Sequence, residues 1–271
     1  VVLRAQADKA FTDFKTNNPD LVLDDTDFFM FGEVYNYSVD GGLAYDFGDK
    51  KVNYFENGFD NLINFQFKYD AQGNYESLFN KYATIKDSLF KDKSFVNYVT
   101  SHDDGQPFDK DRTKTIETGT KLLLTTGISQ VYYGDETARD LTIEGTQGDA
   151  TLRSFMNWDT IDTETTGDVL SHWQKLGVFR RNHPSVGAGT HEMLSEAPYV
   201  FKRAFTKDNF TDTVVVGLDL AVGKKEIVVG NAFAKAEKLR DAYSGKEVTA
   251  INGKVSLDTP YSIVLLEVAR D

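Results

Sequence analysis

The stretch from Phe95 to Phe108 constrains the fold more than any other part of the chain. Its first part, residues 95–100, is a β-branched and aromatic run, which predicts a buried strand. The strand ends at four polar residues: Ser101, His102, Asp103 and Asp104. Such groups need solvation, so they suit the end of a buried strand where it opens into a cleft. In α/β proteins clefts of this kind lie at the carboxyl ends of the strands; a plain polar turn is the simpler alternative.

A second stretch has the same organisation. Four apolar residues, 28–31, are followed by Gly32 and the carboxylate Glu33, and we expect a buried strand over residues 28–34. Desolvation at the end of a buried strand favours the protonated form of a carboxyl group, which suits a general acid. Taken alone, a carboxylate such as Glu33 is more often a surface-facing or salt-bridged residue than a catalytic one. Two strand-end carboxylates, Glu33 and Asp103, are more informative together than either is alone.

Strands and helices alternate through the first two thirds of the chain. We expect strands at 28–34, 60–67, 95–100 and 127–134, and helices at 7–17, 76–92, 111–126 and 168–182. This alternation predicts βα units and a parallel sheet. Residues 35–58 are too long for a simple connection and indicate a functional loop.

The pattern changes after Pro184. Short β-rich runs separated by turn residues follow at 199–205, 213–220, 226–229, 238–243, 255–257 and 261–268. They predict a small antiparallel domain with two sheets. We therefore divide the chain into residues 1–186, with mixed helices and strands, and residues 187–271, with strands only.

Composition excludes several classes of function. The net charge of −12 over 271 residues argues against non-specific nucleic-acid binding. No apolar run has the length of a membrane span, which argues against a membrane-embedded protein. The chain has no cysteine, so it has no disulfides or thiol chemistry, and its compartment stays open. It begins at Val1 without a methionine or a signal peptide, so we expect that Val1 is not the natural start.

Three ordered blocks resemble the alpha-amylase family of glycoside hydrolases, and most of all its periplasmic-type bacterial members. They are Phe-Gly-Glu-Val at 31–34, Ser-His-Asp at 101–103, and 127–136, which ends in Tyr-Tyr-Gly-Asp-Glu. Residues 153–158 resemble the family's Arg-x-x-Met-x-Trp element, and the resemblance covers about residues 7–200. It implies an α/β fold, the second half of a (β/α)₈ TIM barrel, followed by an antiparallel β-sandwich domain.

The resemblance also implies roles for individual residues. Glu33 would be the acid/base of a retaining glycosidase, and Asp103 would stabilise the transition state. His102 would bind a sugar hydroxyl, and Tyr35 would either stack on a glucose ring or pack within the barrel. The implied substrate is starch or a maltooligosaccharide with α-1,4-glucosidic bonds. Ca²⁺ is expected with ligands mostly outside this chain, and the implied location is periplasmic or extracellular.

The departures from the family are as important as the matches. The family nucleophile lies in an Arg-x-Asp-x-x-Lys-His pattern that has no good match here, and the first four barrel strands have no counterpart. We interpret the chain as the carboxyl-terminal part of an amylase that is inactive alone. Because half a barrel exposes apolar surface, we expect it to self-associate or to pair with the missing half. The alternative is a catalytically silent, amylase-like carbohydrate-binding or regulatory protein.

Other polar residues have simpler interpretations. A cation cluster is conceivable at Asp103, Asp104 and Asp109, but calcium sites usually have more regularly spaced oxygen ligands. We expect Asp135 and Glu136 to be structural acids near the mouth of the barrel. His172 and His183 lie on or beside a helix, and we interpret them as surface or core residues and not as metal ligands.

Overall fold

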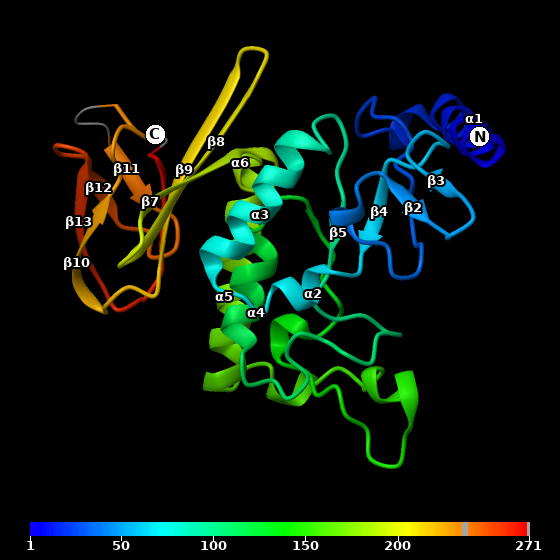
Figure 1. Ribbon diagram of the computed structural model, residues 1–271. Helices are drawn as coiled ribbons and strands as arrows, with labels where there is room; N and C mark the ends of the chain where they lie inside the picture. Colours follow the sequence, from blue (N-terminus) through cyan, green and yellow to red (C-terminus); the bar gives the residue numbers. More distant parts are fainter. Residues whose placement is uncertain (235–237, 270–271) are drawn as a thin grey trace.

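The computed structural model describes residues 1–234 and 238–269. Within these residues a parallel sheet has the strand order β1-β4-β5-β6 (Figure 1). Its strands are β1 (Phe31–Gly32), β4 (Asn61–Asn64), β5 (Val96–Asn97) and β6 (Ile128–Ser129). The loop between β1 and β4 contains the antiparallel hairpin of β2 (Ala44–Asp46) and β3 (Lys51–Asn53). The predicted parallel sheet is therefore confirmed, although its hydrogen-bonded strands are shorter than expected.

Helices separate this sheet from the carboxyl-terminal strands (Figure 1). The separating helices include α3 (Tyr75–Ser88), α4 (Thr115–Leu124), α5 (Glu164–Asn182) and α6 (Pro184–Ala188). The short helix α2 (Phe67–Asp70) follows β4, and α1 (Val2–Asn17) lies at the end of the molecule away from the carboxyl-terminal strands (Figure 1). The longer ones match the predicted helices with shifted ends. α3 begins where the side chain of Asn74 accepts the backbone N–H of Ser77 at 2.8 Å, an N-cap that fixes its first turn.

One expectation about burial is wrong. Residues 28–34 were expected to form a buried strand, but only Phe31–Gly32 pair, and Phe29 and Phe31 are 51% and 49% exposed. The reason is that β1 is a terminal strand, paired with β4 on one side only. Residues 95–100 are buried as predicted, because β5 lies between β4 and β6.

The carboxyl-terminal part is antiparallel, as predicted. Strands β12-β11-β14-β9-β8-β7 form one sheet, and β10 pairs with β13. The bounds are β7 (Thr190–Ser195), β8 (Tyr199–Lys207), β9 (Phe210–Leu218), β10 (Gly223–Val228), β11 (Lys238–Asp241), β12 (Glu247–Thr249), β13 (Lys254–Thr259) and β14 (Val264–Val268). The sequence did not predict β7 or β12.

The larger antiparallel sheet has two apolar faces. Val214 and Val216 of β9 belong to the core shared with the helices, whereas Val215 belongs to the core shared with β10 and β13. Successive side chains of a strand point to opposite faces of the sheet, so this alternation between two cores is expected for a strand that is buried on both faces. The first core continues across residue 187, and the division of the chain at that residue stays a prediction.

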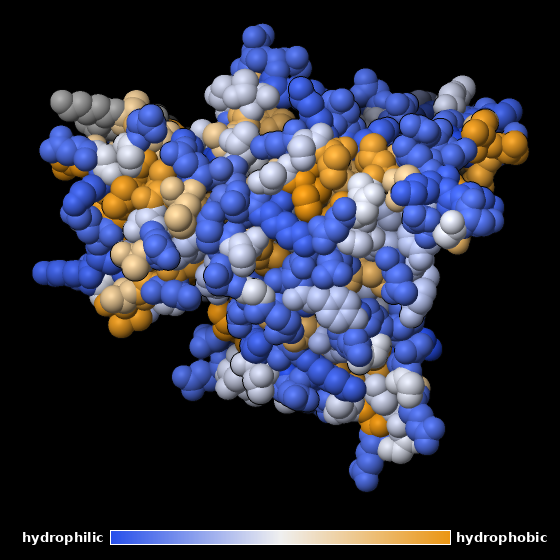
Figure 2. Space-filling model, viewed as in Figure 1, coloured by the Kyte–Doolittle hydropathy of each residue, from blue (hydrophilic) through white to orange (hydrophobic). Residues whose placement is uncertain are grey.

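In the view of Figure 2, apolar side chains gather around the carboxyl-terminal strands, near the upper middle of the face and at the region of α1 (Figures 1 and 2). Within residues 1–234 and 238–269, no helix combines the length and the apolar character needed to cross a membrane.

Candidate active site

A polar pocket of about 560 Å³ lies where the parallel strands end. Its walls come from the segments that follow β1, β4 and β5, together with one residue of a later 3-10 helix. The lining residues are Glu33, Tyr35, Asn36, Phe65, Lys68, Tyr69, Asp103, Asp104, Gly105, Gln106 and Asp149. Carboxyl ends of parallel strands meet at one edge of a sheet, which explains why segments distant in sequence converge here. The structure thus brings Glu33, Tyr35 and Asp103 into one pocket.

Gly32 places Glu33 at the end of β1. A Cβ atom at Gly32 would lie 2.6 Å from the Phe59 ring, so the backbone can approach this ring only without a side chain. The expected burial of Glu33 is wrong, because its side chain is exposed. The same cause applies as for Phe31: no strand covers the outer side of β1 in the described part of the chain.

His102 and Asp103 form a surface pair beside the pocket. His102 Nε2 lies 3.4 Å from Asp103 Oδ2, with side chains 63% and 42% exposed, so this contact contributes little stability. The Ser101 hydroxyl donates to Asp103 Oδ1 at 2.9 Å, which orients the carboxylate. The structure places His102 next to Asp103 but not among the residues that line the pocket.

Beneath Asp103, a partly buried ion pair fixes the loop. Asp104 pairs with Lys68 of α2 and accepts the Tyr98 hydroxyl at 2.6 Å. Burial of Asp104 opposes its ionisation, but the hydrogen bonds from Lys68 and Tyr98 outweigh it and lower the pKa of the carboxyl group. Lys68 pairs with Asp104, and the other carboxyl groups that line the pocket are those of Glu33, Asp103 and Asp149.

Tyr35 is exposed, so packing within the barrel does not describe it. Its side chain is 72% exposed, and its ring meets that of Phe65 edge-on with centroids 5.6 Å apart. One face of an exposed aromatic ring can stack on a sugar.

The suggested cation cluster is not formed. Asp104 is paired with Lys68, and Asp109 accepts the backbone N–H groups of Thr113 and Lys114, both at 2.9 Å. Across the described ranges, no group of three or more His, Cys, Asp or Glu residues could hold a metal ion.

His172 and His183 are both buried. His172 lies 2.9 Å from both the Thr120 hydroxyl and the Tyr243 hydroxyl, and burial lowers its pKa to about 4. His183 lies between two carboxylates, those of Asp212 and Glu267.

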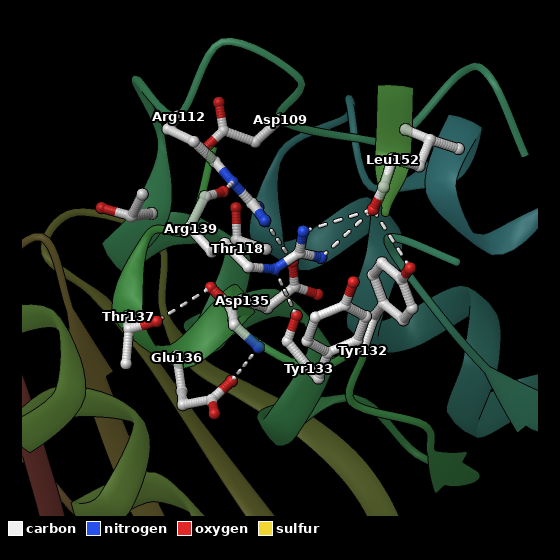
Figure 3. Close-up of polar contacts among 12 residues, drawn as sticks. Asp109, Arg112, Thr118, Tyr132, Tyr133, Asp135, Glu136, Thr137, Arg139 and Leu152 are labelled. Carbon is white, nitrogen blue, oxygen red and sulfur yellow. Dashed lines mark hydrogen bonds and ion pairs between the residues drawn. The ribbon is translucent and has the colours of Figure 1, made fainter. Parts of the chain in front are cut away.

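The arrangement of Arg112 and Arg139 around Asp135 was not predicted (Figure 3). Asp135 is 1% exposed and pairs with Arg112 at 2.8 Å, as suits the structural acid expected there. Burial raises the pKa of Asp135. Arg139 is also 1% exposed and binds backbone carbonyls. No sequence pattern marks Lys68, Arg139 or Asp149.

Comparison with known proteins bears on this arrangement. No family model matches the chain. The chain is 32% identical over 209 residues to the periplasmic alpha-amylase of Escherichia coli (strain K12), a match that covers 76% of this chain and 29% of that protein. The resemblance to the alpha-amylase family is confirmed.

Solved alpha-amylase structures show the same fold. An Anoxybacillus alpha-amylase aligns with a TM-score of 0.63 at 21% identity, covering 99% of this chain and 57% of that one. The Geobacillus thermoleovorans alpha-amylase complexed with acarbose aligns with a TM-score of 0.63 at 17% identity, covering 97% and 57%. AmyP in complex with maltose gives a TM-score of 0.54 at 14% identity, covering 90% and 56%. The chain thus spans 29% of the curated alpha-amylase and somewhat more than half of these solved ones.

Proposed function

We propose that this chain forms part of a retaining glycoside hydrolase that cleaves α-1,4-glucosidic bonds of starch or maltooligosaccharides. The observation that carries the proposal is the convergence of Glu33 and Asp103 in one pocket at the carboxyl edge of the parallel sheet. In this proposal the sheet is the second half of a (β/α)₈ barrel, and the antiparallel strands are the β-sandwich domain that follows it. The acarbose and maltose complexes of the solved relatives support an α-glucan as substrate.

Each pocket residue has a role in the proposed reaction. Glu33 protonates the glycosidic oxygen and then activates water, and its exposed side chain can reach a bound substrate. The carboxylate of Asp103 stabilises the positive charge of the oxocarbenium-like transition state. His102 hydrogen-bonds a sugar hydroxyl beside Asp103, and Tyr35 stacks on a glucose ring. The nucleophile comes from a part of the protein outside this chain, since no carboxylate here matches the family pattern.

The remaining expectations belong to the whole protein. The resemblance to the family implies a Ca²⁺ ion whose ligands lie mostly outside this chain. A periplasmic or extracellular location follows from the similarity to a periplasmic enzyme. An uncharged glucan also suits a chain with a net charge of −12, whereas a nucleic acid does not.

Hydrolysis of maltoheptaose tests the proposal directly. In the complete protein that contains this chain, Glu33→Gln should lower kcat by about 10²–10⁴-fold, the usual contribution of a positioned acid/base. The matched control is Glu196→Gln, which changes an exposed carboxylate in the loop between β7 and β8 and should leave kcat unchanged. The 271-residue chain alone should show no hydrolysis. Wild-type activity in the Glu33 variant would contradict the assignment.

A second function is favoured by one observation, the absence of a match to the nucleophile pattern. The protein would then be an amylase-like carbohydrate-binding or regulatory protein. Isothermal titration separates the two: binding of maltoheptaose by the complete protein without any turnover supports the silent binder, and turnover rules it out.

A further inference from the structure

The carboxylate of Asp104 closes the polar turn, residues 101–106, which also carries Asp103. Its Oδ1 accepts the backbone N–H of Gln106 at 3.1 Å, and its Oδ2 accepts the Tyr98 hydroxyl at 2.6 Å. Tyr98 directly follows β5 and is 1% exposed. Asp104 therefore ties the polar turn back to the strand from which the turn emerges.

The helix α2 holds the same turn through two side chains. The ammonium group of Lys68 pairs with Asp104 Oδ2. The Tyr69 hydroxyl donates to Gln106 Oε1 at 2.6 Å. The ammonium group also lies 4.6 Å from the ring centroid of Tyr69 and 6.0 Å from that of Tyr98. Because α2 follows β4, the polar turn connects the ends of two neighbouring parallel strands.

Burial distinguishes this ion pair from the proposed catalytic carboxylate beside it. The side chains of Lys68 and Asp104 are 4% and 12% exposed, and a charge at this depth depends on its partner. The side chain of Asp103 is 42% exposed, and its carboxylate accepts the Ser101 hydroxyl from within the same turn. The place of the Asp103 carboxylate therefore depends on how firmly the polar turn is held.

We infer that Lys68 is a positioning residue for the proposed reaction, because through Asp104 it fixes the polar turn and with it the carboxylate of Asp103. This inference rests on the proposed function. Lys68 lines the pocket, but its ammonium group is paired with Asp104, so it acts through the turn and not by binding substrate. Transition-state stabilisation requires a carboxylate at one fixed place, so a looser turn slows the reaction.

The first test is the kinetics of Lys68→Met in the complete protein, with maltoheptaose as substrate. A displaced Asp103 carboxylate predicts a fall in kcat of about 10–100-fold, with KM within about threefold of wild type. The matched control is Lys81→Met, which removes an ion pair to Asp70 of the same helix, outside the pocket, and should leave kcat unchanged. An unchanged kcat in Lys68→Met, with or without a change in KM, overturns the inference.

The second test separates positioning from stability. Lys68→Met leaves a partly buried carboxylate without its cation, so it should lower the temperature of thermal unfolding. The double variant Lys68→Met with Asp104→Asn removes both charges and should recover most of that temperature. Its kcat should stay low, because the ion pair no longer joins the polar turn to α2. Recovery of kcat together with stability would show that Lys68 is merely structural. The double variant also replaces Lys68→Met if the single variant does not fold.

The third test asks whether Lys68 acts through Asp103. Asp103→Asn should lower kcat by itself, and adding Lys68→Met to it should lower kcat by less than about twofold more. Effects that multiply would mean that Lys68 acts on the reaction by another route, and the inference would be overturned.

Failure of the proposed function gives a different result. If the wild-type protein does not hydrolyse maltoheptaose, the proposed function is overturned, and the inference with it. If the wild type is active and Lys68→Met has the same kcat, only the inference fails.

Discussion

At the residue scale, His183 connects the end of α5 to two strands of the larger antiparallel sheet. Its Nδ1 lies 2.8 Å from Asp212 of β9, and its Nε2 lies 2.6 Å from Glu267 of β14. Arg240 of β11 pairs with the same Glu267 at 2.7 Å. Burial by itself would lower the pKa of His183, but the hydrogen bonds to the two carboxylates outweigh it and raise the pKa to about 9.

This raised pKa predicts a loss of stability in alkaline solution. Because the folded-state pKa of His183 lies above its unfolded value of 6.5, its contribution is complete below pH 6.5 and is lost as the pH rises through 9. The pKa values of Asp212 and Glu267 are lowered, so their contribution is present above their unfolded pKa values and is lost in acid. The free energy of unfolding should therefore fall between pH 6.5 and 9.5 by an amount on the order of 2 kcal/mol from this residue.

Urea denaturation at the two pH values measures this loss. The wild type should lose more stability between them than His183→Gln, which has no titrating group at this position. Equal losses in the two proteins would show that the change comes from other groups.

At the element scale, the turn after β6 depends on a glycine. Gly134 has φ +84°, and a Cβ atom there would lie 2.5 Å from Cβ of Arg139. Gly134→Ala should lower the free energy of unfolding by about 1–2 kcal/mol for the left-handed backbone and further for the clash. Gly145→Ala is the matched control, because Gly145 has φ +78° but nothing within 4 Å of the added Cβ. Urea unfolding of both variants isolates the clash, and equal losses would contradict it.

The strands differ in how well the sequence predicts their position and their burial. The apolar run at 95–100 is buried as expected, because a central strand meets neighbours on both sides. In the similar run at 28–31, Met30 is buried but Phe29 and Phe31 are exposed, since an apolar pattern does not say whether another element covers it. β7 was missed because Thr190–Ser195 lacks a regular alternation of apolar residues.

The residues in and around the candidate site also differ in whether the sequence could predict them. Glu33, Tyr35 and Asp103 could be placed from sequence, because each follows a strand and the ends of parallel strands meet. Lys68, Asp149 and Arg139 could not. Lys68 reaches Asp104 across 36 positions, and Arg139 binds carbonyls that every residue type carries. Contacts of these kinds leave no local pattern in the sequence.

At the scale of the whole molecule, exposed apolar side chains occur in and next to the two terminal strands of the parallel sheet, β1 and β6. Phe29 and Phe31 lie beside each other near β1, with ring centroids 6.2 Å apart and about half of each side chain exposed. Further exposed apolar residues are Leu21, Leu23, Val131, Tyr133, Phe155 and Trp158. Exposed sheet ends with apolar surface favour pairing with another chain.

We therefore predict that the 271-residue chain self-associates as its concentration rises. Light scattering after size exclusion should give a mass above that of one chain, and Phe29→Ser with Phe31→Ser should shift it toward the monomer because the pair lies at the open end of the sheet. Phe210→Ser is the matched control, since Phe210 is equally exposed, at 49%, but lies at the start of β9. A compact monomer at every concentration that also hydrolyses starch would contradict both this prediction and the proposal that the barrel is completed from outside the chain.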